Sequence, residues 1–562
     1  MVKKILSLIN KQYSGVNEAA ILLGVFSLAS QLLGLIRERA LVSQIGPGVD
    51  LDIYYAAFKI PDLIFTAVAS LVAVTALIPF LTEKIAKEQD NKKAVMFMNR
   101  VFSAFLSAMM IVLGIAYLAM PSLVHFVAPG FSPKALHELS LMSRIMLISP
   151  LLLGLQNLLG SVAQTYRKFF VFALAPVLYN VGILIGIFFF YSKYGIYGLA
   201  YGVVIGAFLH FLIQVPTVLR LGFNPRFTTR LDFKELGEIV KIALPRTLTL
   251  AMNTITVTIL ISLASKISTG SISILNFAIN LQTFPIMMIS LSYAIAAFPT
   301  LVEAFSLGNI EKFKNIVVET ARQIIFWSLP ITTLFIVLRA HIVRVVYGTN
   351  TLSWNDTRLT AGLFALLSFA IIANSLVLIF VRAYYASGRT KVPFFVTVSG
   401  MCITLTAAYF SGVVLTTNIG LSESIAHLFR LTNVSGIKIL SLGIGYCVGQ
   451  FFNLAVFWLL FRKHFGIGVL SPVHGTLFKG ILSSILGGFV TYLVLIFLAP
   501  YVNQNTFLGI LGQGFSAGVV GILVILVVLK LLKSKELSDF TQALHHKFWK
   551  STVIAPGAEG LD

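Results

Sequence analysis

The chain has 562 residues, of which 57% are hydrophobic and only 11% are charged, and its mean hydropathy is +0.91. Soluble globular proteins carry about 25% charged residues, so this composition excludes a soluble protein and indicates one that crosses a membrane many times. The net charge of +21 does not indicate a nucleic-acid-binding domain, because the Lys and Arg residues are scattered over short loops. Membrane topology and an anionic lipid or substrate explain that distribution better.

Uncharged stretches divide the chain into candidate membrane spans. A spanning helix needs about 20 mostly apolar residues, and this criterion predicts an all-α polytopic membrane protein with about 14 transmembrane helices. No small-residue cleavage site follows the basic start at Lys3 and Lys4, so we expect no removable signal peptide. A polar connector at 220–241, whose pattern is typical of a helix along the membrane surface, separates the sixth span from the seventh. The spans are predicted near 17–45, 52–81, 101–124, 143–166, 169–192, 194–219, 245–266, 270–303, 318–339, 359–386, 392–415 and 439–462, with two more within 480–529.

The basic residues predict the orientation of the chain. They gather in alternate loops, whereas the intervening loops at 46–51 and 500–506 have none. An even number of spans places both ends on one side, and Lys and Arg stay on the cytoplasmic side. We therefore expect both termini in the cytoplasm. The basic loops contain Lys84, Lys87, Lys92, Lys93, Arg167, Lys168, Arg220, Arg226, Arg230, Lys312, Lys314, Arg389, Lys391, Arg462, Lys463, Lys533 and Lys535.

Charge is concentrated between the first two predicted spans, from Gly34 to Asp62. The stretches 19–36 and 63–81 on either side carry none. Ionisable groups there are costly unless they face protein or a water-filled cavity, which makes them candidates for a functional site; charges that reach the headgroups at helix ends are the alternative. The sequence favours a functional role for Arg37 and Lys59 and leaves both explanations open for Asp50 and Asp52.

Two short motifs recur at a spacing of roughly 220 to 225 residues. ALIPFLTE at 76–83 is echoed by AAFPTLVE at 296–303, and RKFFV at 167–171 is echoed by KVPFFV at 391–396. This spacing is the length of six spans with their loops, so we expect two six-helix repeats. An even number of spans per repeat makes the repeats parallel, an arrangement typical of transporters that alternate access by moving one half against the other.

This organisation predicts four parts of the chain. We expect an N-terminal lobe at 1–230 and a second lobe, with the connector, at 231–470. Two C-terminal spans follow at 471–533, and a polar cytoplasmic tail, expected to be mobile, follows at 534–562.

Several kinds of chemistry are not indicated. Cys402 and Cys447 lie inside apolar runs and provide neither a disulfide framework nor a CxxC metal site. There is no GxxxxGK[ST] loop for ATP and no HExxH zinc motif. We therefore expect no catalytic residues, no cofactor, no metal site and no nucleic-acid partner.

Six segments, covering the chain from about residue 18 to 535, resemble one known family. They are GLIRERA at 34–40, DIYYAAFKIPD at 52–62, VAPGF at 127–131, RKFFVFALAPVLYN at 167–180, TGSISILNFA at 269–278 and RAYYASGRTKVP at 382–393. In this order they resemble the MurJ (MviN) lipid II flippases of the multidrug/oligosaccharidyl-lipid/polysaccharide (MOP) exporter superfamily.

The resemblance implies a transporter and not an enzyme. Its expected substrate is the undecaprenyl-diphosphate-linked peptidoglycan precursor, lipid II, which would move from the inner to the outer leaflet of the bacterial cytoplasmic membrane during cell-wall biosynthesis. The resemblance also implies alternating access between the lobes and a groove for the lipid tail in the last two spans. Membrane lipids and cell-wall synthesis proteins are the expected partners.

The resemblance further implies which residues form the site. The family lines its cavity with arginines that meet the diphosphate, and the matching cations here are Arg37 and Lys59, with Glu38 and Asp52 as supporting charges. Three family arginines are replaced, by Gln31, Phe65 and Asn280. The substrate-binding set expected from the matched positions and the remaining donors is Gln31, Arg37, Arg39, Lys59 and Asn280.

Because part of the cationic lining is replaced, two alternatives stay open. One is a flippase or exporter of another lipid-linked oligosaccharide or of a drug within the same superfamily. The other is a non-transporting scaffold for envelope assembly. Arg37 and Lys59 favour transport over a scaffold, whereas the apolar Phe65 favours a different cargo over lipid II.

Overall fold

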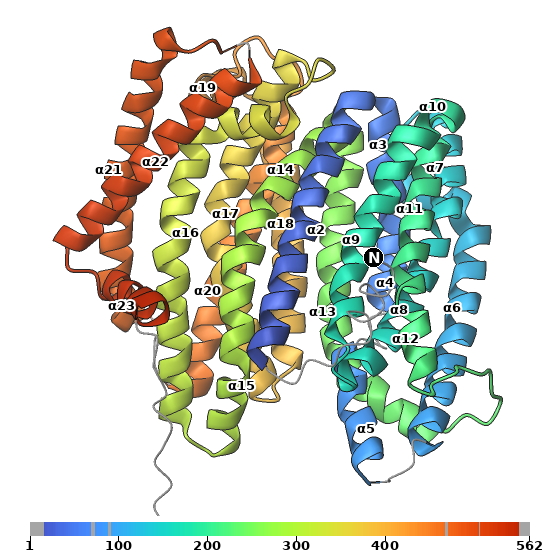
Figure 1. Cartoon of the computed structure of the whole chain (residues 1–562). Helices are drawn as coiled ribbons and strands as arrows, with labels where there is room; N and C mark the ends of the chain where they lie inside the picture. Colours follow the sequence, from blue (N-terminus) through green and yellow to red (C-terminus); the bar gives the residue numbers. More distant parts are fainter. Residues whose placement is uncertain (1–15, 69–73, 88–91, 467–469, 505, 550–562) are drawn as a thin grey trace, which may run out of the picture. The chain divides into compact units, whose positions relative to one another are not determined.

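The computed structural model describes residues 16–68, 74–87, 92–466, 470–504 and 506–549, and every regular element within them is a helix (Figure 1). Twelve helical stretches in this part of the chain are long and apolar enough to cross a membrane. The predicted all-α membrane fold is therefore confirmed. The exact count of fourteen spans stays a prediction, because the first two predicted spans correspond to α2 and to the broken series α3, α4 and α5.

The helices of the first 220 residues are α2 (Val16–Gln44), α3 (Val49–Ala57), α4 (Lys59–Ala67), α5 (Val74–Lys87), α6 (Lys92–Val127), α7 (Pro133–Met146), α8 (Ile148–Thr165), α9 (Phe169–Ile185), a π-helical turn at Gly186–Phe190, α10 (Tyr191–Tyr194), α11 (Ile196–Leu212) and α12 (Val215–Arg220). The following helices are α13 (Phe233–Ser265), α14 (Ser271–Pro285), a π-helical turn at Ile286–Leu291, α15 (Ser292–Ser306), α16 (Ile310–Tyr347), α17 (Trp354–Ala386) and α18 (Lys391–Thr417). The chain ends with α19 (Ile419–Phe429), 3₁₀ turns at Ile437–Ile439 and Ala499–Tyr501, α20 (Leu440–Phe465), α21 (Leu470–Leu498), α22 (Phe507–Leu531) and α23 (Lys535–Trp549).

The second predicted span, 52–81, is interrupted between α3 and α4. Pro61 has no backbone N–H, so the carbonyl of Ala57 loses its helical partner four residues ahead. The helix accordingly ends at Ala57 and a new one begins at Lys59. This break places Asp52 and Lys59 on separate short helices, where each can take its own direction.

The described residues fall into two compact units. Unit 1 comprises the described parts of Met1–Leu281, Val343–Leu367 and Arg389–Asn453. Unit 2 comprises those of Gln282–Ile342, Ser368–Gly388 and Leu454–Asp562. The predicted lobe boundaries at 230 and 470 stay a prediction.

In unit 1, α9 and α11 pack through glycines. A Cβ atom on Gly182 would lie 2.2 Å from the Cα of Gly206, and one on Gly202 would lie 2.5 Å from the Cα of Gly186. Small residues allow two membrane helices to approach this closely, and packing between their backbones then holds them together. The contact fixes α9, which also packs against α2 and carries Asn180 toward that helix.

In unit 2, residues 535–549 form the helix α23, and Glu536 and Phe540 in its first half contact neighbouring helices. The expected mobility of the tail stays a prediction. Glu536, near the start of α23, accepts hydrogen bonds from Arg322 Nε at 2.9 Å, Thr476 Oγ1 at 2.5 Å and Ser534 Oγ at 2.8 Å. Farther along α23, Phe540 packs edge-on against Trp327, with ring centroids 5.0 Å apart. One buried carboxylate and one aromatic contact therefore attach α23 to α16.

The hydrogen bonds also determine the charge state of Glu536. Burial alone raises the pKa of this carboxyl, but the bonds from Thr476, Ser534 and Arg322 outweigh burial, and the net pKa is lowered below its usual 4.5. A carboxylate with a lowered pKa stabilises the folded state above its unfolded pKa, and this stabilisation is lost as the pH falls through the folded pKa.

We expect Gly202→Ala to destabilise the protein, because the added Cβ meets the Cα of Gly186. Overpacking of this kind costs about 1–3 kcal/mol, visible as a lower thermal unfolding temperature in detergent. Gly24→Ala is the matched control, because a Cβ there meets nothing within 4 Å. Equal unfolding temperatures for both variants would contradict the proposed close packing.

We expect α23 to stay docked at neutral pH and to detach in acid, as the pH falls from 4.5, the usual pKa of the carboxyl, through the lowered pKa of Glu536 in the folded protein. Hydrogen–deuterium exchange of peptides from 535–549, corrected for the intrinsic pH dependence of exchange, measures this detachment. Glu536→Gln cannot titrate, so its exchange protection should be weaker at pH 7 and should change little with pH. An unchanged pH response in that variant would show that another group controls docking.

Candidate functional site

The charged segment forms a hydrogen-bonded cluster on α2, α3 and α9. Arg37 donates from Nη2 to Glu38 Oε1 at 2.6 Å and from Nη1 to Asn180 Oδ1 at 3.1 Å. The Tyr55 hydroxyl donates to the other Glu38 oxygen, also at 2.6 Å. The amide nitrogen of Asn180 donates to the carbonyl and hydroxyl oxygens of Ser30, at 3.3 and 3.2 Å. Three helices are therefore joined around one ion pair.

This cluster satisfies Glu38 but leaves one donor of Arg37 unused. Glu38 is 5% exposed, and both of its oxygens accept short bonds. The Nε–H of Arg37 is buried and has no acceptor within the described residues. Because buried donors are nearly always bonded, an unused guanidinium N–H is the natural place for an oxygen atom of a ligand to bind.

Asp52 caps the start of α14 from a distant part of the sequence. It is 1% exposed, and its oxygens accept from the backbone N–H of Gly270 at 2.7 Å, the N–H of Ser273 at 2.8 Å and the Ser273 hydroxyl at 2.6 Å. Gly270 has φ +86°, a conformation that favours glycine. A carboxylate at a helix N-terminus is stabilised by the unpaired N–H groups and by the helix dipole.

Arg39 makes the complementary contact at a helix C-terminus. Its guanidinium donates to the carbonyl oxygens of Val345 at 2.6 Å and Gly348 at 3.1 Å, where α16 ends. A cation there satisfies carbonyls that have no partner within the helix and opposes the negative end of its dipole. The structure thus uses Arg39 to hold the end of α16.

Further contacts lie beside these two helix ends, within unit 1. The Thr351 hydroxyl donates to the Val42 carbonyl, and the N–H of Gly130 donates to Ser265 Oγ at 3.1 Å. The ring of Phe277 stacks on Tyr347 at 4.5 Å and meets Tyr55 edge-on at 6.1 Å. We call Asp52, Arg39 and these contacts the gate cluster, because they tie residues 39–130 to residues 265–351.

The other predicted site residues lie outside these two clusters or at their border. Lys59 is half-buried at the start of α4 and interacts electrostatically with Asp62 and Glu38. Gln31 on α2 is half-buried, as is Phe65 on α4. Asn280 on α14 is exposed and bonds to the Tyr347 hydroxyl. The structure therefore brings Arg37 and Glu38 together and places Arg39 and Asp52 at helix ends.

Sequence reasoning missed Asn180, Tyr55 and Ser273. All three lie in family-like segments, and a lone Asn in an apolar span is itself a signal of a bonded site. The hydroxyl of Tyr55 gives no such signal, because tyrosines are common at the ends of membrane helices. Within the described residues no group of three His, Cys, Asp or Glu side chains is arranged to hold a metal ion.

Comparison with known proteins identifies the family. The family model described as "Lipid II flippase MurJ" matches residues 41–512, which include most of the helices above. The chain belongs to the MurJ lipid II flippase family. The predicted family membership is therefore confirmed, and the protein is a transporter and not an enzyme.

Named MurJ relatives cover most of the chain at low identity. A probable lipid II flippase MurJ of Borreliella burgdorferi is 26% identical over 381 residues, which is 68% of this chain and 74% of the relative. The lipid II flippase MurJ of Burkholderia cenocepacia is 24% identical over 463 residues, covering 80% of this chain and 84% of the relative. The MurJ family assignment therefore extends over both halves of the sequence.

Solved structures agree with this MurJ assignment at the level of the fold. A lipid II flippase MurJ in an inward closed conformation matches with a TM-score of 0.68 and 20% identity, covering 93% of this chain and 99% of the other. A MATE-family multidrug transporter of the MOP superfamily, in an inward-facing conformation, matches with a TM-score of 0.62 and 15% identity, covering 78% and 94%.

We expect Asp52→Asn to loosen the gate cluster, because the neutral amide loses the charge-assisted bonds to α14. Bonds of this type contribute about 1.5–3 kcal/mol, so the peptide containing Gly270 and Ser273 should exchange its amide hydrogens at least about tenfold faster. Asp50→Asn is the matched control, because Asp50 is exposed and two residues away. Equal exchange protection of this peptide in both variants would show that Asp52 does not stabilise the gate cluster.

Proposed function

We propose that this protein is a lipid II flippase, which moves the undecaprenyl-diphosphate-linked peptidoglycan precursor from the inner to the outer leaflet by alternating access. The observation that carries the proposal is the MurJ family match over residues 41–512. The buried Arg37 cluster and the gate cluster support it, because a flippase needs an anion site and a barrier that can open.

Arg37 and Lys59 are the cations that we propose for the diphosphate. A phosphate oxygen that bonds a guanidinium or an ammonium group gains a charge-assisted bond, which is stronger where water is excluded. Arg37 has an unused Nε–H for this purpose. Glu38 and Tyr55 keep the guanidinium in place through the 2.6 Å bonds to the Glu38 carboxylate.

Neutral donors take over part of the role of the missing arginines in this proposal. Gln31 and Asn280 stand where the family places arginines, and each side-chain amide can donate two hydrogen bonds. Arg39, in contrast, holds the C-terminus of α16 with its N–H groups. We therefore assign Gln31 and Asn280 to the substrate site and Arg39 to the gate.

The gate cluster supplies the barrier of the proposed transport cycle. Asp52 and Arg39 belong to the predicted N-terminal lobe, 1–230, and their partners on α14 and α16 belong to the predicted second lobe, 231–470. Opening this side requires the helix ends to exchange these partners for water. Because the bonds join side chains to helix termini, they can break without unfolding either helix.

The C-terminal helices α21 and α22, residues 471–533, are the proposed groove for the lipid tail. They pack against each other and expose large apolar side chains such as Phe489, Phe497 and Phe515, which are 59%, 67% and 70% exposed. Such a surface suits lipid chains. We place the protein in the bacterial cytoplasmic membrane with both termini in the cytoplasm, and keep cell-wall synthesis proteins as predicted partners.

A different lipid-linked cargo is the second candidate function. The observation that favours it is the half-buried Phe65, which stands where the family places an arginine. An apolar ring contributes no bond to a phosphate, and the same fold occurs in exporters of other compounds in the MOP superfamily. Fold similarity alone does not choose between cargoes.

Complementation tests the proposed cargo. The chain is expressed in a bacterium depleted of its own lipid II flippase, beside Arg37→Ala and Lys59→Ala, and growth is scored at equal membrane abundance. We expect rescue by the parent chain and at least about tenfold loss of viable cells with Arg37→Ala, because breaking a buried pair leaves Glu38 uncompensated and removes the anion donor. Lys59→Ala should also lose rescue.

Two control variants show whether a loss of rescue comes from the Arg37 guanidinium itself. Lys193→Ala, which removes an exposed cation of the short helix α10, should rescue like the parent. Arg37→Lys keeps the charge but not the fork of N–H groups, so it should rescue only partly. If the parent inserts well and fails to rescue, while binding a diphosphate-linked lipid of another sugar, the second candidate function replaces the first.

A further inference from the structure

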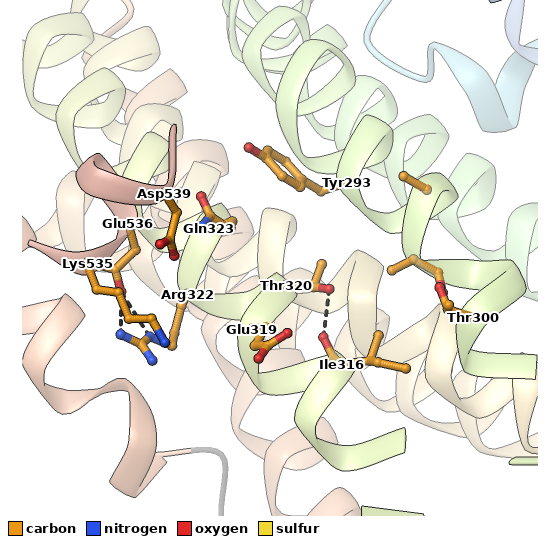
Figure 2. A pocket seen from close by; sticks show the side chains of 12 residues that line it. Tyr293, Thr300, Ile316, Glu319, Thr320, Arg322, Gln323, Lys535, Glu536 and Asp539 are labelled. Carbon is orange, nitrogen blue, oxygen red and sulfur yellow. Dashed lines mark hydrogen bonds and ion pairs between the residues drawn. The ribbon is translucent and has the colours of Figure 1, made fainter. Parts of the chain in front are cut away.

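A cavity of about 610 Å³ opens in unit 2 between α15, α16 and α23 (Figure 2). Its lining residues belong to unit 2, whereas all residues of the Arg37 and gate clusters belong to unit 1. Its lining combines small apolar residues, such as Ala296 and Ala297, with charged side chains from α16 and α23. Neither the flippase cycle nor the lipid-tail groove proposed above uses this cavity.

One wall of the cavity is an ion pair whose carboxylate accepts hydrogen bonds at both oxygens. Arg322 Nη2 lies 2.7 Å from Glu536 Oε1, and Glu536 is 3% exposed. Beside this pair, the indole N–H of Trp327 donates to the Tyr293 hydroxyl at 3.2 Å, which fixes another lining side chain. The cavity therefore has a preformed shape, as small-molecule sites usually have.

Three other charged side chains line the cavity, and all three are exposed. Figure 2 shows Glu319 on α16 facing the same opening as Asp539 on α23, whose first residue is Lys535. In the described part of the chain, none of these three side chains forms a hydrogen bond or an ion pair. A ligand that matches this arrangement carries a hydrogen-bonding cation for the two carboxylates and an anion for the ammonium group.

The cavity lies where a transmembrane helix ends. The span α22 ends at Leu531, and α23 begins four residues later at Lys535. Phe478, next to Lys479 near this end, is 66% exposed, as expected for a residue that faces lipid. Lys479 donates to the carbonyl of Lys533 at 3.0 Å, and basic groups of this kind gather at the headgroup level.

We propose that this cavity binds the headgroup of an aminophospholipid, a phosphatidylethanolamine. Its primary ammonium group donates to Glu319 and Asp539, its phosphate meets Lys535, and its glycerol end faces Ala296 and Ala297. Phosphatidylcholine has no N–H to donate, and phosphatidylglycerol offers only an anion to a site with two unpaired carboxylates. The lipid would clamp α23 against α16, independently of which cargo the protein moves.

Lipid titration of the purified full chain, followed by native mass spectrometry, tests this proposal. The probes are dioleoyl-phosphatidylethanolamine, dioleoyl-phosphatidylcholine and dioleoyl-phosphatidylglycerol. We expect phosphatidylethanolamine to bind at one site about tenfold more tightly than either of the other two lipids. One charge-assisted hydrogen bond accounts for a difference of this size. Equal affinity for phosphatidylethanolamine and phosphatidylcholine in the unmodified protein would overturn the proposal without any variant.

A double variant locates the site. Glu319→Gln with Asp539→Asn should remove the preference for phosphatidylethanolamine, whereas Glu311→Gln, which removes an exposed carboxylate from the same helix outside the cavity, should keep it. Persistence of the preference in the double variant would place the lipid elsewhere and overturn the assignment. Because no transport is measured, the result is separate from the complementation test of the flippase function.

Discussion

Glu38 carries a negative charge into a part of the molecule that is almost closed to water, and the arrangement of the surrounding helices follows from that charge. A buried carboxylate is tolerated only when it is paired and hydrogen-bonded. Arg37 and Tyr55 supply the pairing from α2 and α3, and Asn180 holds Arg37 from α9. The glycines between α9 and α11 support the same cluster, because they set how closely α9, which carries Asn180, can lie to α11.

In the gate cluster, helix ends stabilise the charged side chains. Asp52 bonds to the N-terminus of α14, and Arg39 bonds to the C-terminus of α16. Helix termini carry partial charges of about half an elementary charge, so these bonds stabilise the contact yet leave little isolated charge behind when they break. Such a contact can open and close repeatedly. The Arg37–Glu38 pair is expected to stay formed, because separating it would leave a charge buried without a partner.

The sequence located a charged segment between two apolar spans. It did not show which of these charged side chains bond to one another and which bond to helix ends. The density of charge between two apolar spans favoured a functional role for Arg37 and Lys59, because membrane sequences make such charges conspicuous. Glu38 and Asp52 were expected only from the family resemblance, and Arg39 only as a remaining donor. Apart from the Ser273 hydroxyl, the partners given for Asp52 and Arg39 are main-chain atoms more than 200 residues away, at 270, 273, 345 and 348. No side-chain pattern indicates main-chain partners. The break at Ala57 was encoded by Pro61, whereas the docking of α23 depends on Arg322 and Thr476, which lie far from Glu536 in the sequence.

Because Asp52 and Arg39 bond mostly to main-chain atoms, substitutions can remove these contacts mainly from one side, at Asp52 and Arg39 themselves. Substitutions on α14 and at the end of α16 leave the amide and carbonyl groups in place, with Ser273 as the only side chain there that bonds Asp52 in the described contacts. A mutational scan would therefore detect the two helix-end contacts mainly through Asp52, Arg39 and Ser273, because their other partners are main-chain atoms. Second-site suppressors of Asp52 substitutions are accordingly expected in changes that shift helix position or backbone flexibility, and not in compensating charges.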